Sequence, residues 1–376
     1  MKRLLVFILL ACLAVSPALT GGSYARGEID LSPYAVPVPQ TTAAYGDARL
    51  TVVTVQRGEA YESSLCYEVD GQQVSTVPLP GESSEGEPLG HVPFATQEGR
   101  LGLFSYTGRN SLFRLQWWEN GQLIPCLEET DISRPKVLRT CAMAVRKAEP
   151  QLACWNLDGT LRFTLPLDTG NATVYDAAET EDGSLLLAIQ AADGPSDRDW
   201  EVLRLSAQGA VLLRAAVSDL EGFSNDNQRF LAPDGQGGFY FFAAPSADYK
   251  QNILQHLDAQ GKRIFSKALR AENAIVDINL AESDEQGSMI LYGTVFADSR
   301  GLFRAFALTV DAQGNILSRD FRDFTTPCGY NYYLLATADG EKAVLAYDAD
   351  ASPDQAWYQV PFDALPAAED PGVTLT

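Results

Sequence analysis

One short turn recurs along the chain and constrains its fold more than any other feature. In each copy an apolar run ends in a turn closed by glycine, and a second apolar run follows. The closing glycines are Gly71, Gly121, Gly159, Gly209, Gly261 and Gly314. They are separated by 50, 38, 50, 52 and 53 residues. Spacing this regular indicates an internal structural repeat.

The residues of these turns favour β-hairpins. Asp-Gly at 70–71 and Asn-Gly at 120–121 suit the two-residue primed turns of a tight hairpin. Asp-Ala-Gln-Gly at 311–314 suits a slightly longer turn in which the glycine adopts a positive φ. We therefore expect each copy to join two antiparallel strands rather than to begin a helix.

A second series of glycine turns lies about half a repeat away from the first. Its members are Gly46, Gly99, Gly183, Gly235 or Gly237, Gly287 and Gly340. Dense apolar runs follow these turns, as at 185–189 and 239–244. A strand that is apolar on both faces is typical of one buried on both faces. The inner strands of each repeat should therefore be covered by neighbouring repeats.

Two hairpins per repeat give four antiparallel strands, and four-stranded units at this period are typical of propeller blades. We expect an all-β chain that folds as a single β-propeller, with seven four-stranded blades favoured over six or eight. The expected blades cover residues 40–80, 91–128, 135–167, 171–217, 223–269, 275–321 and the part from 329. The third of these is short and lacks a clear first glycine turn.

The last repeat lacks a fourth strand. It has a first hairpin and a third strand around residues 357–360. The N-terminal segment 27–39, in which Tyr34, Val36 and Val38 alternate, is expected to supply the missing strand. Pairing both ends of the chain in one blade would close the ring and cover strand edges that are otherwise exposed.

The repeat resembles that of bacterial extracytoplasmic β-propeller proteins in general. The resemblance covers nearly the whole chain after its first residues and implies a repeated scaffold. It carries over no functional residue. The stretch 156–161 contains the Asp-Gly-Thr of sialidase-like turns but lacks their Ser and Trp. The turn-and-tryptophan pattern of quinoprotein propellers is also not repeated.

The first residues have the three parts of a secretory signal. Met1, Lys2 and Arg3 precede an apolar run over 4–15, and small and turn-forming residues follow it. We expect cleavage after Ala18 or Ala25, so that the protein is secreted or lies at the cell surface.

The expected domain organisation is a signal peptide at 1–25, the propeller at 26–365 and a C-terminal tail at 366–376. An alternative is lipoprotein processing, since residues 9–12 resemble a lipobox that ends at Cys12. Cys12 would then carry a lipid anchor, which is the only membrane contact we expect.

The charge of the chain argues against nucleic acid as a partner. Lys and Arg number 28 against 49 Asp and Glu, which gives a net charge of −21. A surface this negative repels phosphate backbones and anionic lipids.

The cysteines and histidines indicate neither a metal site nor a cofactor. The five cysteines after Cys12 match no zinc or haem spacing, and their odd number argues against a disulfide framework. Cys141 and Cys154 are the pair to test for a bridge, although buried thiols are favoured for most of the five. His91 and His256 are the only histidines, and both are expected to be packed or surface-facing side chains rather than ligands.

Polar residues of the innermost strands are candidates for a binding site in the central channel. Aligning these strands on their turns places four side chains at one level: Asp176, Gln228, Asp277 and Tyr333. The alternative is that they are ordinary polar residues that hold channel water.

A second candidate site lies on the face opposite the glycine turns, where the longer loops gather. Four residues are expected there: Trp200, Tyr249, Tyr330 and Asn331. An aromatic platform among amides and carboxylates suits a sugar or a peptide, unless the rings are half-packed blade edges. The acidic loops 193–199 and 348–354 lack the order of a calcium loop, and no metal is expected.

We expect a non-catalytic protein that binds a protein, a peptide or a glycan at the cell surface, because no catalytic motif interrupts the repeat. The sequence has no nucleophile elbow and no phosphate-binding loop. The alternative is a secreted glycan hydrolase or lyase that uses channel carboxylates about 5 to 9 Å apart, one of them with a raised pKa.

Overall fold

The structure is a computed structural model that describes most of the chain. The described residues are 35–36, 41–57, 60–81, 89–96, 98–107, 112–149, 151–167, 173–190, 200–217, 230–243, 252–272, 274–284, 287–297, 302–323, 333–336, 342–347 and 357–376. They form two compact units, and each unit is considered by itself.

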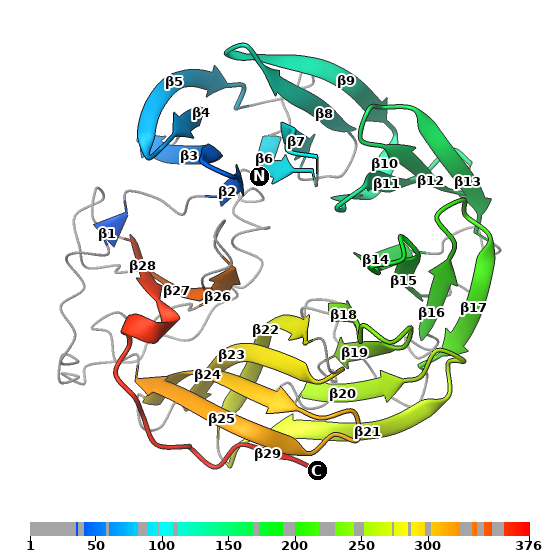
Figure 1. The fold of residues 1–376 in the computed structure, drawn as a ribbon, viewed down its shortest axis with the longest axis vertical. Coiled ribbons are helices and arrows are strands. Elements are labelled where there is room, and N and C mark those ends of the chain that lie inside the picture. The colour runs from blue at the N-terminus through cyan, green and yellow to red at the C-terminus, as the bar shows by residue number, and fades with distance from the viewer. Residues whose placement is uncertain are drawn as a thin grey trace. The chain divides into compact units, whose positions relative to one another are not determined.

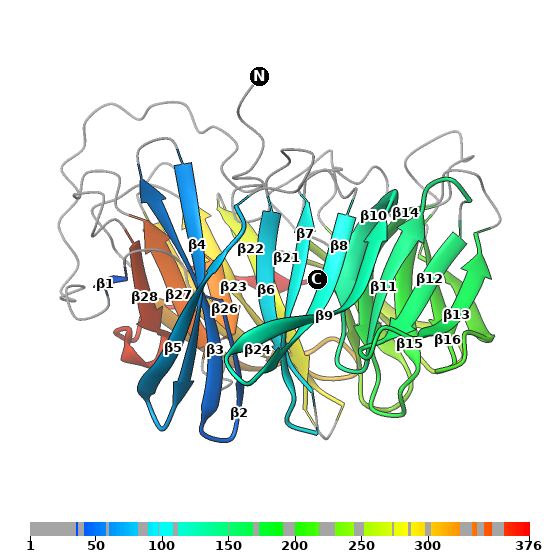
Figure 2. The same cartoon turned by 90° about the horizontal axis from the view of Figure 1, so that it is seen from above.

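The first unit contains three antiparallel sheets of four strands in sequence order (Figures 1 and 2). One sheet comprises β2 (Thr41–Tyr45), β3 (Ala48–Arg57), β4 (Ala60–Val69) and β5 (Gln72–Leu79). The next comprises β6 (Leu89–Ala95), β7 (Leu101–Thr107), β8 (Leu112–Glu119) and β9 (Gln122–Thr130). The third comprises β10 (Ile132–Val137), β11 (Cys141–Arg146), β12 (Gln151–Asn156) and β13 (Leu161–Pro166).

The second unit contains four further antiparallel sheets. The first comprises β14 (Thr173–Glu179), β15 (Leu185–Gln190), β16 (Trp200–Leu205) and β17 (Val211–Ala216). The second comprises β18 (Phe230–Pro233), β19 (Phe239–Ala243), β20 (Asn252–Leu257) and β21 (Arg263–Arg270). The next is β22 (Ile275–Ser283), β23 (Met289–Ala297), β24 (Leu302–Val310) and β25 (Ile316–Asp323). The last joins β26 (Tyr333–Ala336), β27 (Lys342–Tyr347) and β28 (Trp357–Pro361) to β1 (Ala35–Val36).

The turns form as their residues predict. Asp70 and Gly71 both have positive φ, 54° and 71°, which is the backbone of a primed two-residue hairpin turn. In the longer type, Asp311 Oδ1 accepts hydrogen bonds from the backbone N–H groups of Gln313 and Asn315. These contacts lie within one turn, which is why the sequence alone indicates them.

The cores lie between consecutive sheets of each unit. Phe113, Trp155 and their neighbours fill the space between the second and third sheets. In the second unit, Tyr240 and Phe306 belong to one cluster that spans two sheets, and all five residues of β19 are buried. Strands β14, β18, β22 and β26 also contact one another in succession, so the first strand of each sheet lies beside the first strand of the next (Figure 1).

The all-β prediction is confirmed, and the sheets follow the expected repeat closely. The third repeat has four strands although its first turn, at 138–140, contains no glycine. In the last sheet, Ala35 pairs with Tyr358 and Val36 with Trp357, so a part of segment 27–39 is the fourth strand there. The number of blades and the closure of a ring stay predictions.

The C-terminal segment 366–376 belongs to the second unit and is packed against its other strands. Its strand β29 (Thr374–Leu375) pairs with β21 as a fifth strand, and Val373 is buried in the core cluster. Arg319 of β25 donates one hydrogen bond to Asp370 and one to the carbonyl of Val373. The segment therefore links the outer strands of two neighbouring sheets. Within the described part of the chain, no helix has the length and apolarity needed to cross a bilayer.

Candidate functional site

Asp176 and Asp277, two of the four channel candidates, lie on the first strands of sheets in the second unit. Asp176, on β14, is partly buried, and its Oδ2 accepts a hydrogen bond of 2.9 Å from the backbone N–H of Leu231 on β18. This carboxylate therefore helps to join two neighbouring sheets.

Asp277, on β22, has a different environment. Its side chain is exposed, yet the protein atoms around it restrict solvation and raise the pKa of Asp277 to about 6. Asp277 and Asp176 thus differ in burial and hydrogen bonding although they were expected at one level.

The other two channel candidates are described less fully. Gln228 lies outside the described residues. Tyr333 begins β26, where its backbone pairs with Leu345, and its side chain lies outside the description. The channel site stays a prediction.

The loop-face prediction is wrong for Trp200. Its side chain is fully buried and packs against Tyr175 and Phe241, with ring centroids 4.6 and 6.2 Å away. Trp200 is a core residue because the chain enters β16 at this position, so the ring points between two sheets. Tyr249, Tyr330 and Asn331 lie outside the described residues.

Both histidines are packed side chains. The ring of His91 lies 2.8 Å from Ser105 Oγ through Nδ1 and 2.9 Å from the carbonyl of Pro80 through Nε2, and burial lowers the pKa of His91. His256 is buried in β20 and stacks on Tyr240. In the described ranges, no group of three or more His, Cys, Asp or Glu side chains is placed to hold a metal ion.

Cys141 and Cys154 are not joined by a disulfide, so the bridge weighed from their spacing is absent. They lie on adjacent strands, where Cys141 is opposite Asn156 and Cys154 is opposite Met143. Both thiols are buried, as the sequence favours.

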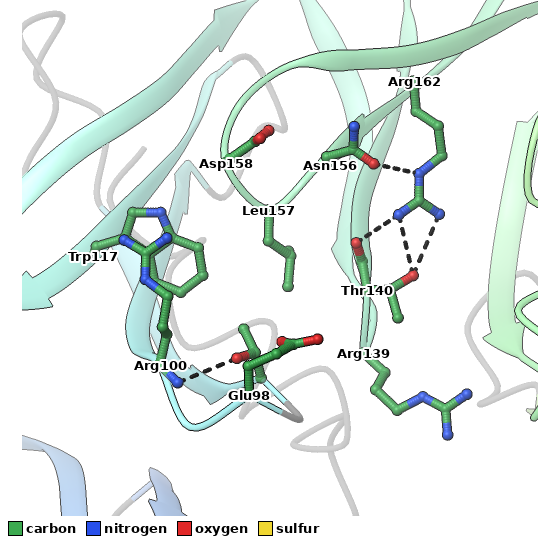
Figure 3. A pocket seen from close by; sticks show the side chains of 10 residues that line it. Glu98, Arg100, Trp117, Arg139, Thr140, Asn156, Leu157, Asp158 and Arg162 are labelled. Carbon is green, nitrogen blue, oxygen red and sulfur yellow. Dashed lines mark hydrogen bonds between the residues drawn. The ribbon is translucent and has the colours of Figure 1, made fainter.

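A pocket of about 350 Å³ lies between the second and third sheets of the first unit (Figure 3). A volume of this order is typical of small-ligand sites. Its lining residues are Thr96, Glu98, Arg100, Trp117, Arg139, Thr140, Asn156, Leu157, Asp158 and Arg162. They come from the glycine-turn ends of the sheets, the face opposite the one that the sequence favoured for binding.

The turns themselves position these side chains. Residues 96–100 connect β6 to β7, residues 139–140 precede β11, and residues 156–158 lead from β12 toward β13. Trp117 comes from β8 and Arg162 from β13. The site thus brings together short segments of two sheets, and the only signal for it in the sequence is arginine near several turns.

Arg162 is held in the pocket by neutral groups. Its Nε donates 2.7 Å to Asn156 Oδ1, and its terminal nitrogens donate to the hydroxyl and the carbonyl of Thr140, the latter at 2.8 Å. Figure 3 shows the guanidinium between these two residues. Among the described residues, no carboxylate forms an ion pair with Arg162, so its charge is oriented but not neutralised.

Arg100 lies at the other side of the pocket. Its guanidinium carbon stands 3.9 Å from the centroid of the Trp117 ring, and its NH2 group donates 2.7 Å to Glu119. The Trp117 ring is itself buried. Arg100 therefore covers the ring, and its charge is paired with that of Glu119.

Asp158 stabilises the turn in which it lies. The Thr160 hydroxyl and backbone N–H donate to Asp158 Oδ1 at 2.6 and 2.8 Å, and these bonds lower the pKa of Asp158. A carboxyl with a lowered pKa is ionised at neutral pH and cannot act as a general acid.

Cys126 lies beside the same turn but is no nucleophile. Its Sγ donates 3.2 Å to the carbonyl of Leu115, and burial raises the pKa of the Cys126 thiol to about 11. The thiolate, which is the reactive form, is therefore scarce at neutral pH. The arrangement around the pocket offers donors that neutral groups hold in place, which suit binding more than catalysis.

Comparison with known proteins assigns no family. No family model matches the chain, and no curated protein matches it. Among solved structures, a protein of unknown function from Bacteroides caccae is 16% identical, with a TM-score of 0.33 over 60% of this chain and 80% of that chain. Sqt1 from Chaetomium thermophilum, bound to the N-terminus of ribosomal protein L10, is 11% identical, with a TM-score of 0.45 over 89% and 94%.

An acylaminoacyl peptidase from Pyrococcus horikoshii is 12% identical, with a TM-score of 0.47. The match covers 92% of this chain and 52% of the peptidase, so it spans about half of that protein. At TM-scores this low, these similarities assign neither an activity nor a partner to the chain.

Proposed function

We propose that this chain is an exported, non-catalytic β-propeller that binds a protein or a peptide in the pocket between its second and third sheets. In this proposal the seven sheets are seven blades, and β1 closes the ring by completing the last one. The protein is secreted or held at the cell surface.

The proposal rests on one observation: the polar side chains of the pocket are held in place by hydrogen bonds to neighbouring groups. The guanidinium of Arg162 is fixed by Asn156 and Thr140, and the carboxyl of Asp158 is fixed by its own turn. Rigid donors of this kind fix the orientation of a ligand without the entropy loss of ordering them during binding. A catalytic carboxyl pair would need one member with a raised pKa, whereas the pKa of Asp158 is lowered.

Two further features support export and closure. The expected signal precedes β1, which is the first described strand and pairs with β28 in the last sheet. The net charge of −21 suits a soluble protein outside the cell.

The test is a peptide and glycan array probed with residues 26–376, followed by obstruction of the pocket. Glu98→Trp places a large ring at the exposed rim and should weaken peptide binding at least about tenfold. Glu181→Trp is the matched control, because Glu181 is an exposed glutamate in the turn between β14 and β15. The proposal fails if no peptide binds, or if Glu98→Trp leaves peptide binding at the level of the control.

The alternative function is a glycan-active enzyme, and one observation favours it. The protein atoms around the Asp277 carboxyl restrict its solvation and raise its pKa to about 6, a value that suits a general acid. A turnover assay on polysaccharides with Asp277→Ala and Asp176→Ala tests this reading. Activity that both substitutions abolish would replace the binding proposal.

A further inference from the structure

We infer that the outer edges of β21 and β25 form a strand-binding site, and that the partner which fits this site is segment 366–376 of a second copy of the chain. In the structure the site is filled by the chain's own segment 366–376, which we call the strap. The inference goes beyond the proposed function and does not depend on the pocket. It follows from the contacts that hold the strap and from the sheets that are complete without it.

The strap lies along two strand edges that pair with no other described strand. At the edge of β25, the backbone N–H of Ala368 donates 2.7 Å to the carbonyl of Phe321. At the edge of β21, the N–H of Ala268 donates 2.8 Å to the carbonyl of Thr376, and the N–H of Thr376 donates 3.0 Å to the carbonyl of Ala268. Figure 1 shows the strap, in red, passing from β25 to β21. Main-chain bonds of this kind are how an edge strand accepts an added strand.

An apolar socket beneath the strap takes one side chain. Val373 is 1% exposed and belongs to the same core cluster as Leu269 of β21 and Phe321 of β25. Leu375 and Ala368 are partly buried and pack against this cluster. Backbone pairing gives an added strand its affinity, and pockets for alternate side chains give it specificity. The socket therefore restricts which segment can bind at these edges.

Two arginines of the site bind polar groups of the strap. Arg319, on β25, donates 2.6 Å to the carboxylate of Asp370 and 2.6 Å to the carbonyl of Val373. Arg270, on β21, donates 3.2 Å to the hydroxyl of Thr376. The site thus fits an extended segment with an acidic residue three positions before a buried branched side chain. Segment 366–376 has this pattern, so a second copy of the chain carries a matching ligand.

The sheets of the site are complete without the strap. Its strand β29 is a fifth strand beside four that the repeat supplies, and β25 is the last strand of a four-stranded sheet. Leu365, directly before the strap, is buried in a core cluster with Val360 of β28. Within the strap, Val373 is the only buried residue. Because segments with few buried contacts open locally, the strap can leave its site while the sheets stay folded.

An opened copy offers both a site and a free strap. Its site fits the strap of a second copy, and its strap fits the site of that copy, so the contacts are reciprocal, as in a two-fold dimer. Within one chain, the strap competes at an effective concentration on the order of 1 mM. The dimer should therefore form at high protein concentration, or when the strap of the accepting copy is weakened.

The experiment traps the exchange with a disulfide between two copies of residues 26–376. The accepting copy carries Ala268→Cys and the donating copy carries Thr376→Cys, because these two residues pair at the β21 edge. Mass spectrometry of the oxidised mixture identifies the bond between the introduced cysteines. We expect its yield to rise at least about tenfold between about 10 μM and about 1 mM protein. An accepting copy with Val74→Cys instead gives the baseline, because Val74 is exposed and lies in the first unit.

One substitution should act in opposite directions in the two copies. In the accepting copy, Val373→Asp places a charge in the apolar socket and so expels that copy's own strap, which should raise the yield at least about tenfold at low protein concentration. In the donating copy, Val373→Asp should lower the yield to the baseline. Asp370→Asn removes the exposed charge that Arg319 binds, and it should change the yield in the same two directions by about two- to fivefold.

These opposite effects separate strand exchange from a general loss of stability, which would act alike in either copy. A yield that stays at the Val74→Cys baseline at the highest protein concentration would overturn the inference. A change in the same direction from both placements of Val373→Asp would overturn it as well. If Val373→Asp lowers the melting temperature of the chain, Asp370→Asn decides the question. Peptide binding is measured separately, so a failure here leaves the proposed function intact.

Discussion

Nε2 of His256 lies 3.0 Å from Oδ2 of Asp234, and both side chains are buried. Nδ1 of the same ring lies 2.8 Å from the carbonyl oxygen of Ala312, which belongs to the turn between β24 and β25. This buried pair therefore links a turn of one sheet to a turn of the next.

Breaking the pair should be costly. Asp234→Asn replaces the carboxylate that is hydrogen-bonded to His256 by a neutral amide, and we expect the free energy of unfolding to fall by about 1 to 3 kcal/mol. Urea denaturation at pH 7 measures this loss of stability. Asp258→Asn is the control, since Asp258 also accepts two backbone hydrogen bonds within its turn but is only partly buried and has no histidine partner in the described structure. A loss no greater than in this control would contradict the interpretation.

The same pair predicts an acid-dependent loss of stability. Burial by itself raises the pKa of Asp234, but the hydrogen bonds from His256 and the Gln236 N–H outweigh it and hold the pKa below its usual 3.8. A lowered carboxyl pKa contributes stability above the unfolded value, and this contribution is lost as the pH falls through the folded value. The stability difference between the wild type and Asp234→Asn should therefore shrink below about pH 3.8.

The C-terminal segment should stabilise the second unit through Val373. This side chain is 1% exposed, so Val373→Ala should lower the free energy of unfolding by about 1 to 3 kcal/mol. Val74→Ala is the matched control, because Val74 is 61% exposed, and it should change stability by less than about 0.5 kcal/mol. Thermal unfolding of both variants checks the expectation.

Removal of the segment should also be visible at a single amide. The backbone N–H of Ala268 donates 2.8 Å to the carbonyl of Thr376. A chain truncated after Leu365 should exchange this amide hydrogen much faster than the full chain, because β21 loses its neighbouring strand. Unchanged exchange at Ala268 would show that β29 does not hold this edge in solution.

Asp277 should make the protein less stable as the pH rises. Its pKa is raised to about 6, so between about 4 and 6 the folded chain keeps a proton that the unfolded chain has released. Stability therefore falls with increasing pH across this window, and Asp277→Asn should remove that dependence. The side chain is exposed, so the effect should be modest. Unfolding of wild type and variant at pH 4 and pH 7 tests the sign.

Gly159 should tolerate no side chain, whereas Gly121 should tolerate a small one. Both have positive φ, 87° and 80°, so alanine costs about 1 kcal/mol of backbone strain at either site. At Gly159 a β-carbon would also collide with the carbonyl oxygen of Cys126, and at Gly121 it would meet no atom within 4 Å. Gly159→Ala should therefore destabilise the protein clearly more than Gly121→Ala in urea denaturation. Equal losses would show that the two sheets can separate at this contact without cost.

Much of the fold could be predicted from the sequence, because its signals are local. The positive φ of Asn120 and Gly121 follows from two adjacent residues, and the burial of β19 follows from five consecutive apolar ones. Their regular return along the chain then indicates sheets of four strands.

The candidate sites could not be predicted in the same way, because they depend on contacts between residues that are far apart in the sequence. Trp200 follows a polar stretch and was expected at the surface, but Tyr175 and Phe241, from elsewhere in the chain, enclose its ring. Arg100 and Arg162 are far apart in sequence and face one pocket only because two sheets pack side by side.

The two channel aspartates show which features follow from the sequence and which depend on the tertiary structure. The sequence determined that Asp176 and Asp277 occupy similar places on the first strands of their sheets. A β-bulge lies directly before Asp176 in β14, whereas in β22 the bulge follows Ile278, after Asp277. Since a bulge redirects the residues beside it, Asp176 reaches the backbone of Leu231 and Asp277 stays exposed. The alignment of turns fixes the position along a strand, but only the pairing of strands fixes the direction of the side chain.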